Sequence, residues 1–312
     1  MNKNNLLFQC TFVLCLLAIS ACYLDETDPG VVTIEYSNLG EFYEAKGVAL
    51  QTFDENLDSE LVITGKEGTV IRIGQNDLIT PNATIATGKV KVELREIYTK
   101  SQMILSNMTT SSQGEVLESG GQMYLTVTNA ADETLSLKSG ANLSAMMPKS
   151  NSSTIANPGE MTAFYGIEDL GFSWIQDQNG SVDFDSIGDS FNLLTNRFGW
   201  INCDYFYQTT TPKTTVRFGV SLPNSANIEV AAFMVFTDIN SVMGLNYSTT
   251  DKEFFKSNIP TNESVSLIVI GMDATSFYFA QEDIVTSNNL DLNLMLNQIS
   301  ETSLINNLNS LN

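Results

Sequence analysis

The most regular pattern in this chain is a strict alternation of apolar and polar residues in short runs. In residues 89–94, Val90, Val92 and Leu94 fall on one face of an extended chain, and the residues between them are charged. Residues 122–128 repeat this period of two. Because successive side chains of a β-strand point to opposite faces, both runs predict antiparallel strands with one buried and one solvated face.

Turn signals and apolar runs extend this pattern through the chain. Residues 65–68, which contain two glycines, and the dipeptide Asn179-Gly180 each separate two strand-like runs, so both predict hairpins. Residues 228–236 and 265–270 are continuously apolar, as central strands of a sandwich are. We therefore expect a mainly all-β fold with two Ig-like β-sandwich domains and a short C-terminal helical segment.

The best boundary between these domains is a Ser-, Asn- and Pro-rich connection at residues 149–159. The predicted organisation is a signal peptide at 1–21, an acidic tether at 22–45, a first sandwich at 46–148, a second sandwich at 160–286 and a C-terminal helical segment at 288–312.

The C-terminal segment is predicted from leucines and isoleucines that recur through residues 290–311 and suit one or two amphipathic helices. Asn288 or Asn289 can cap the first helix, and a second can begin near Glu301. We expect the segment to dock onto the second sandwich, and a helix laid against a partner is the alternative.

The N-terminal residues predict export and anchoring. Lys3 precedes an apolar run at residues 6–19, which is too short to span a bilayer. The run ends in Ile19-Ser20-Ala21-Cys22, which resembles the lipobox of bacterial lipoproteins. The resemblance implies cleavage before Cys22 and attachment of diacylglycerol and an amide-linked chain such as palmitate to Cys22. The alternative is an ordinary secretory signal cut near Ala21.

The residues after Cys22 are acidic, and this spacer is similar to the surface-export signal of Bacteroidetes lipoproteins. The resemblance implies an outer-membrane, lipid-anchored protein exposed at the cell surface, with a periplasm-facing position as the alternative. The formal net charge of the chain is −21. Such a charge repels nucleic acid, so we expect the membrane, through the lipid anchor, but no nucleic acid among its partners.

Two further stretches carry a family resemblance. Residues 68–73 with residues 88–98, and the segment Phe198-Gly199-Trp200-Ile201-Asn202-Cys203-Asp204-Tyr205-Phe206, resemble uncharacterised Bacteroidetes cell-surface lipoproteins. The first stretches are also distantly similar to the β-sandwich shared by zonula occludens proteins and netrin receptors. This family implies tandem β-sandwich domains and supplies no catalytic residues.

The chain contains no histidine, which excludes Ser-His-Asp and Cys-His catalysis and His-ligated zinc. Cys203 is the one cysteine left after processing and lipidation, so we expect a buried, inert thiol. Carboxylate pairs such as Glu93 with Glu96, or Asp183 with Asp185, are the remaining candidates for glycan hydrolysis. We expect no catalytic residue, no cofactor and no enzymatic activity.

Candidate binding residues come from two groups. Trp174, Trp200 and Tyr205 can form an aromatic platform for sugar rings, and burial in a β core is the alternative. The loop around Asn179-Gly180 offers oxygen ligands for calcium, although a plain hairpin tip also explains it. The calcium candidates are Asp177, Asn179, Asp183 and Asp185.

These observations favour an envelope-anchored lipoprotein with a non-catalytic binding or display role, whose ligand is a glycan or another envelope protein. The alternative is a structural subunit of a fimbria-like surface assembly that grows by strand addition at an open sheet edge. A third, less favoured function is a carboxylate-dependent glycan hydrolase.

Overall fold

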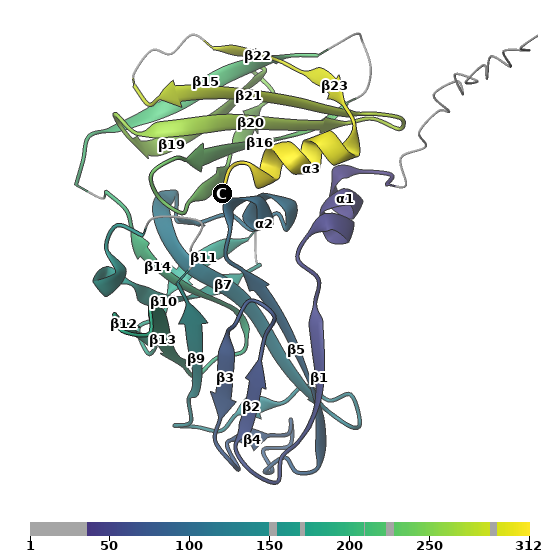
Figure 1. The fold of residues 1–312 in the computed structure, drawn as a ribbon, viewed down its shortest axis with the longest axis vertical. Helices are drawn as coiled ribbons and strands as arrows, with labels where there is room; N and C mark the ends of the chain where they lie inside the picture. Colours follow the sequence, from purple (N-terminus) through teal and green to yellow (C-terminus); the bar gives the residue numbers. More distant parts are fainter. Residues whose placement is uncertain (1–35, 150–154, 169–171, 209, 223–227, 288–291) are drawn as a thin grey trace, which may run out of the picture. The chain divides into compact units, whose positions relative to one another are not determined.

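The computed structural model describes residues 36–149, 155–168, 172–208, 210–222, 228–287 and 292–312. Strands dominate these residues, which confirms the mainly all-β prediction. Four of their sheets face each other in pairs, and we call the pairs the first and the second sandwich (Figure 1). The signal peptide and Cys22 lie outside the described residues.

Sheet 1 of the first sandwich has the strand order β1-β5-β7-β14-β10-β11, with β6 added beside β7. Its described strands pair antiparallel. Its strands are β1 (Gln51–Asn56), β5 (Lys89–Ile97), β6 (Ser111–Ser112), β7 (Glu115–Asn129), β10 (Thr162–Ile167), β11 (Ser173–Gln176) and β14 (Gly199–Phe206).

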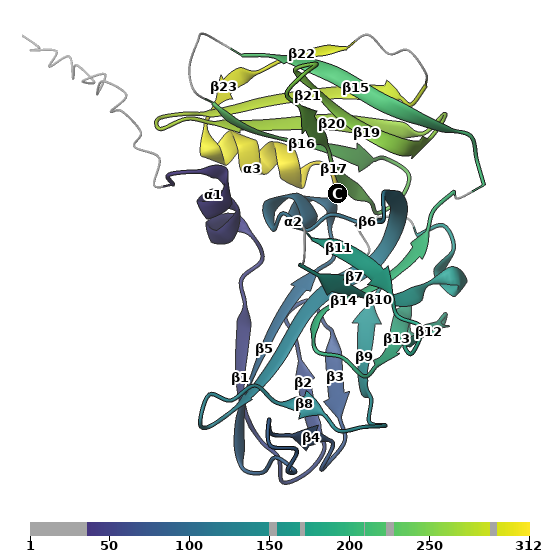
Figure 2. The same ribbon diagram turned by 180° about the vertical axis from the view of Figure 1, so that it is seen from behind.

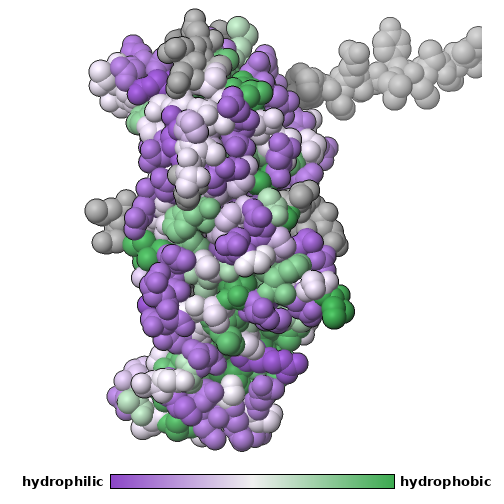
Figure 3. Space-filling model, turned by 90° about the vertical axis from the view of Figure 1, so that its left-hand side faces the viewer, coloured by the Kyte–Doolittle hydropathy of each residue, from purple (hydrophilic) through white to green (hydrophobic). Residues whose placement is uncertain are grey.

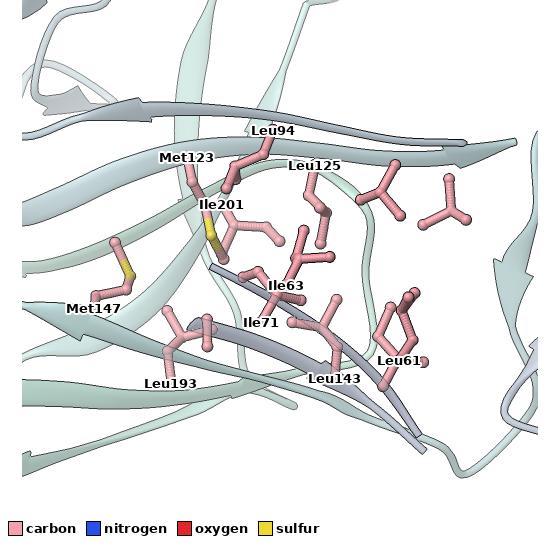
Figure 4. Close-up of a cluster of buried hydrophobic side chains, with 14 of the residues drawn as sticks. Leu61, Ile63, Ile71, Leu94, Met123, Leu125, Leu143, Met147, Leu193 and Ile201 are labelled. Atoms are coloured by element: carbon pink, nitrogen blue, oxygen red, sulfur yellow. The ribbon is translucent and has the colours of Figure 1, made fainter. Parts of the chain in front are cut away.

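Sheet 2 packs against one face of sheet 1 and has the order β12-β13-β9-β3-β2. Its strands are β2 (Leu61–Thr64), β3 (Val70–Ile73), β9 (Leu143–Pro148), β12 (Ser181–Asp185) and β13 (Ser190–Thr195), and a small sheet of β4 (Leu78–Ile79) and β8 (Ser136–Leu137) lies beside the core. Alternate residues of both sheets fill the interior, as Figure 4 shows for Ile63, Leu94, Leu125 and Leu193. The predicted alternation in residues 89–94 is confirmed, because Val90, Val92 and Leu94 are buried there.

The second sandwich is built from the C-terminal part of the chain. Sheet 3 has the order β18-β19-β15-β22 and sheet 4 has the order β17-β16-β20-β21-β23. Their strands are β15 (Lys213–Ser221), β16 (Glu229–Phe236), β17 (Val242–Gly244), β18 (Asn246–Ser248), β19 (Glu253–Pro260), β20 (Ser264–Met272), β21 (Phe277–Val285), β22 (Asn293–Met295) and β23 (Asn297–Ile299).

A third apolar core joins the two sandwiches. It combines residues on the outer face of sheet 1, such as Ile97 and Trp174, with residues on the outer face of sheet 4, such as Phe233 and Ile268. Helices α1 (Leu39–Lys46), α2 (Lys100–Leu105) and α3 (Glu301–Asn309) contribute to it, and Figures 1 and 2 show α2 and α3 between the sandwiches. Part of the outer face of sheet 1 is therefore covered by the rest of the protein.

The strand pairing does not follow the expected boundary at residues 149–159. β13 pairs with β9, and β14 pairs with β7, so strands from both sides of that segment share sheets. The first sandwich thus continues through Phe206, and the connection to the second sandwich follows β14. Composition marked a loop correctly, but a loop that crosses between two sheets of one sandwich has the same composition as a linker between domains. The short 3-10 helix Pro158–Glu160 lies in this loop.

The predicted hairpin at Asn179-Gly180 is also wrong. β11 belongs to sheet 1 and β12 to sheet 2, so this turn carries the chain from one sheet to the other. The hairpin around residues 65–68 is confirmed by the antiparallel pairing of β2 with β3.

Two expectations about the chain ends change as well. Part of the predicted tether, residues 39–45, lies in α1, whose Leu39, Phe42 and Tyr43 are buried and whose N-terminus is capped by Asn38. At the other end, Leu294 belongs to the short strand β22, since leucines at every second residue suit a strand better than a helix. The helix near Glu301 is confirmed as α3, and Leu304 and Leu308 are buried in the joining core.

No helix in the described ranges is both long and apolar enough to cross a bilayer. Figure 3 views the side on which β12 and β13 lie in Figure 1, and it shows hydrophobic residues in separate groups among hydrophilic ones. Single exposed apolar residues such as Met146 and Leu194, both on sheet 2, are normal for a solvated sheet face.

Candidate functional site

The two tryptophans lie together on the outer face of sheet 1, as the platform prediction requires. Trp174 on β11 and Trp200 on β14 have ring centroids 6.5 Å apart and nearly perpendicular planes. Trp174 is completely buried, and its indole N–H donates a hydrogen bond to the carbonyl oxygen of Thr109 at 2.8 Å. Trp200 is partly exposed. The buried tryptophan supports the site, and only the other can touch a ligand.

Phe172 completes the packing around the tryptophans. Its ring lies 4.8 Å from that of Trp174 and 6.0 Å from that of Trp200, in edge-to-face contacts. Gly166 makes room for this arrangement, because a Cβ at that position would lie 2.6 Å from the Phe172 ring and 2.7 Å from the Cβ of Trp200. A glycine beside two large rings is therefore required by close approach rather than by a turn.

Tyr124 on β7 extends the aromatic surface across the sheet. It is the register partner of Trp200, and the two ring centroids lie 5.2 Å apart. Arg95 on β5 lies opposite Tyr124 on its other side and is partly exposed. We name Tyr124, Phe172, Trp174 and Trp200 the aromatic shelf. Aromatic faces next to a hydrogen-bonding cation are suited to ligands that have both apolar and hydroxylated faces.

Polar rows lead away from the shelf along the same face. Glu93 and Lys91 point to the side of Arg95 because they alternate with buried residues on β5, and they face Thr126 and Thr128 of β7. The Lys91 ammonium lies 3.1 Å from the Glu93 carboxylate, and this hydrogen bond raises the pKa of Lys91.

A pocket of about 640 Å³ lies where these rows end. Charged and amide side chains from β1, β5 and the turn after β7 line it, including Asp54, Lys89, Lys91, Asn129 and Asp132. At about 3.4 Å per residue, Tyr124 and Asn129 are roughly 17 Å apart along β7. Shelf, rows and pocket thus form one elongated polar and aromatic face, which we name the open face of sheet 1.

Tyr205 does not belong to this face. It lies on the side of β14 opposite to Trp200 and packs against the core of the first sandwich. Its hydroxyl accepts a hydrogen bond from the Asn157 amide at 3.1 Å and is hydrogen-bonded to Glu118. Burial raises the pKa of both Tyr205 and Glu118. The predicted aromatic trio is therefore divided between the two faces of sheet 1.

The calcium candidates serve as turn-forming groups. The buried Asp177 carboxylate accepts hydrogen bonds from the Asn179 N–H at 3.0 Å and the Thr195 hydroxyl at 3.1 Å, and it lies 3.6 Å from Arg197 Nε. Asp185 accepts a hydrogen bond from the N–H of Ile187, and backbone N–H groups lower its pKa.

Asp183 is exposed on β12. Within the described parts of the chain, no three Asp, Glu, Cys or His side chains are placed to hold one metal ion.

The proposed catalytic pair Glu93 and Glu96 is divided by the pleat of β5. Glu93 lies on the open face, whereas Glu96 is fully buried and accepts hydrogen bonds from Gln51, the Glu67 N–H and the Thr69 N–H. These bonds pin the β2–β3 hairpin to sheet 1. The hairpin glycine Gly65 leaves room for the Glu96 carboxylate, which a Cβ would overlap.

Cys203 is completely buried, as predicted, and burial raises the pKa of its thiol. A high pKa keeps the thiol protonated and therefore unreactive.

No protein-family model matches this chain, and no curated protein matches it either.

Sequence reasoning did not single out Tyr124, Phe172 or Arg95. One signal was available for Tyr124, because it stands between the core positions Met123 and Leu125 of a predicted strand and so had to face outward. For Phe172 and Arg95 no local signal exists, since only the strand order places them beside Trp200.

Proposed function

We propose that this chain is an envelope-anchored lipoprotein whose folded part binds a glycan along the open face of sheet 1 and catalyses no reaction. The anchor rests on the lipobox-like Ile19-Ser20-Ala21-Cys22, and surface exposure rests on the acidic spacer behind Cys22. An outer-membrane position follows from the same residues. Several acyl chains on one cysteine provide a practically permanent anchor.

The observation that carries the binding proposal is the environment of Trp200. A partly exposed indole is held between Tyr124 and Phe172 and backed by the buried Trp174. Such a rigid ring pays little entropy on binding, and sugar rings present C–H faces that pack on it. The polar rows next to it supply donors and acceptors for hydroxyl groups.

A glycan array with the delipidated chain tests this proposal, followed by calorimetry on any hit. We expect Trp200→Ala to weaken binding by about tenfold to a hundredfold, the usual effect of truncating a central aromatic contact. Tyr247→Ala is the matched control, because Tyr247 is an exposed aromatic on the second sandwich. Equal binding by wild type and a folded Trp200→Ala variant would contradict the proposal.

Fluorescence supplies an independent readout, because the chain has two tryptophans. Trp174→Phe leaves Trp200 as the sole indole. Titration of this variant with the sugar should shift the emission of Trp200 if the ring packs against the ligand. An unchanged spectrum at saturating ligand would place the binding elsewhere.

A second candidate function, a subunit of a fimbria-like assembly, is favoured by one edge of sheet 4. β20 pairs with all of β21, whereas β23 pairs only with Phe277–Phe279. The rest of the β21 edge borders a pocket of about 350 Å³ between β21, β22 and β23. A strand from a partner can add to such an edge. Size measurement of the delipidated chain distinguishes the candidates, since polymers favour assembly and a monomer that binds sugar favours the first proposal.

A further inference from the structure

A buried polar cluster lies where the second sandwich meets the outer face of sheet 1. Its members are fully buried and come from β7, β14 and the turn between β16 and β17. They are Ser119, Gln122, Asn202, Asp204 and Asn240. Neither the glycan-binding proposal nor the anchor uses them.

Asn240 ties the two sandwiches together. Its side-chain amide donates hydrogen bonds to the carbonyl oxygens of Tyr98, at 3.0 Å, and Ser119, at 2.8 Å. The Ser119 N–H donates in return to the Asn240 carbonyl oxygen at 3.0 Å. A β-bulge lies beside this contact, since the register of β7 with β14 shifts between Cys203 and Asp204, the register partner of Ser119.

A chain of hydrogen bonds connects Ser119 to Asp204 through Asn202. The Ser119 hydroxyl donates to the Asn202 amide oxygen at 3.1 Å, and the Asn202 amide N–H donates to Asp204 Oδ2 at 2.6 Å. Among the described residues, the other oxygen, Asp204 Oδ1, has no hydrogen-bond partner. The amide oxygen of Asn240 and both polar atoms of the Gln122 amide, Oε1 and Nε2, are also buried there without a partner. One carboxylate oxygen, two amide oxygens and one amide nitrogen of the cluster are thus unpaired.

No cation balances this carboxylate among the described residues. No lysine or arginine forms an ion pair with Asp204 there, and the charged side chain that acts on it is Glu118, another acid. Burial is the main cause that raises the pKa of Asp204, and Glu118 adds to it, whereas Ser119 and Asn202 act in the opposite direction without cancelling the effect of burial. An isolated buried charge is so costly that such a group takes up a proton instead.

We propose that Asp204 is a proton-binding site at the junction of the two sandwiches, protonated in the folded protein and donating from Oδ1 to an otherwise unpaired amide oxygen of the cluster. The proton gives the unpaired Oδ1 an O–H group to donate, and it removes a buried negative charge that lies near a second acid, Glu118. Contact between the sandwiches is then linked to pH, since loss of this proton leaves a charge buried beside Asn240.

The other titratable groups around Asp204 do not replace this role. Glu118 lies on β7, its carboxylate is bound to the Ala156 N–H and to Tyr205, and burial raises its pKa as well. Burial also raises the pKa of Cys203, next along β14. Tyr98 on the β5 side is bound to Thr69, and burial raises its pKa. On the second sandwich, Asp238 acts on Lys100, whose ammonium donates to the Thr237 carbonyl oxygen.

The test compares wild type with Asp204→Asn, an uncharged isostere of the protonated acid, in unfolding experiments from pH 4.5 to 8.5. A group whose pKa is raised in the folded state stabilises the fold fully at pH values below its pKa in the unfolded state, which is near 4 for an aspartate. That stabilisation is lost as the pH rises toward the pKa in the folded state. The folding constant of wild type relative to the variant should therefore fall about tenfold per pH unit in that window. Asp183→Asn, an exposed aspartate, is the control and should follow wild type.

Parallel pH profiles for wild type and Asp204→Asn would overturn the proposal. A chelator that lowers the Tm of wild type but not of the variant would also overturn it, because a cation would then hold the place of the proton. If the variant does not fold, infrared spectra of wild type labelled with ¹³C-aspartate decide the question. A protonated carboxyl band at pH 7 supports the proposal, and its absence refutes it.

Discussion

Two neighbouring rows of side chains on the outer face of sheet 1 differ in exposure. The first row contains Gln122 and Asn202, which are fully buried under the second sandwich. The next row, two residues along the same strands and about 7 Å away, contains Tyr124 and Trp200, which are partly exposed. In these two pairs the polar side chains are covered and the aromatic ones are partly open, whereas an apolar neighbour in the first row, Phe164, is buried as hydropathy favours.

The difference is made by what lies above each row. Over the first row lie α2, the loop that follows it, and the turn that carries Asn240. The cover over the second row is incomplete, because it buries Trp174 but leaves the rings of Tyr124 and Trp200 partly exposed. A junction of polar groups fixes the position of the second sandwich, because each hydrogen bond works at one geometry, whereas exposed rings remain available to a ligand.

The largest effect should come from Trp174→Ala, which removes the buried ring that packs against Trp200 in the partly exposed row. Removing a fully buried indole should lower the free energy of unfolding by about 3–5 kcal/mol. Urea denaturation of the delipidated chain measures it, with Tyr247→Ala as a surface control. A loss below about 1 kcal/mol would show that the Trp174 ring contributes little to the stability of this face of sheet 1.

A smaller loss is expected for Asn240→Ala, which acts on the covered row. It removes two hydrogen bonds to the carbonyl oxygens of Tyr98 and Ser119 and leaves both acceptors buried. The free energy of unfolding should fall by about 1–3 kcal/mol. Hydrogen exchange should rise at Ser119 and Val242, whose N–H groups bond across the junction. Faster exchange spread evenly over the protein would argue against a local joint.

The smallest effect is expected for Glu93→Gln on the open face. The Lys91–Glu93 ion pair is solvated, so its loss should leave the Tm unresolved from that of wild type. The pKa of Lys91, which Glu93 raises, should fall toward its ordinary value, and NMR titration measures it. A clear drop in Tm would mean that the partly exposed row, like the buried one, contributes to the stability of the fold.

Local patterns predicted the strands well. The runs at 89–94 and 122–128 lie in β5 and β7, and the alternation placed the buried side chains of β5 correctly. These features follow from the period of two in an extended chain, which needs no knowledge of partners. The leucine pattern at 290–296 shows the limit of such local patterns, since it predicts a helix although its described part contains the strand β22.

The sequence did not predict which strands pair with one another. Asn179-Gly180 reads identically whether the next strand stays in its sheet or crosses to the facing one, and here it crosses. For the same reason Trp174 and Trp200 meet while Tyr205 turns to the other face of β14. Contacts between residues far apart in the chain depend on strand order, which local composition does not encode.

By itself, the sequence determined a β-rich, histidine-free, acidic chain with a lipobox-like start, and it predicted the burial of Cys203. Only the tertiary structure decided which part of sheet 1 is covered. That cover buries Asp204 without an ion pair to any described lysine or arginine and leaves Trp200 partly exposed. The physical reason is that charge state and exposure depend on the neighbours that folding brings to a side chain, and these come from strands and turns remote in sequence.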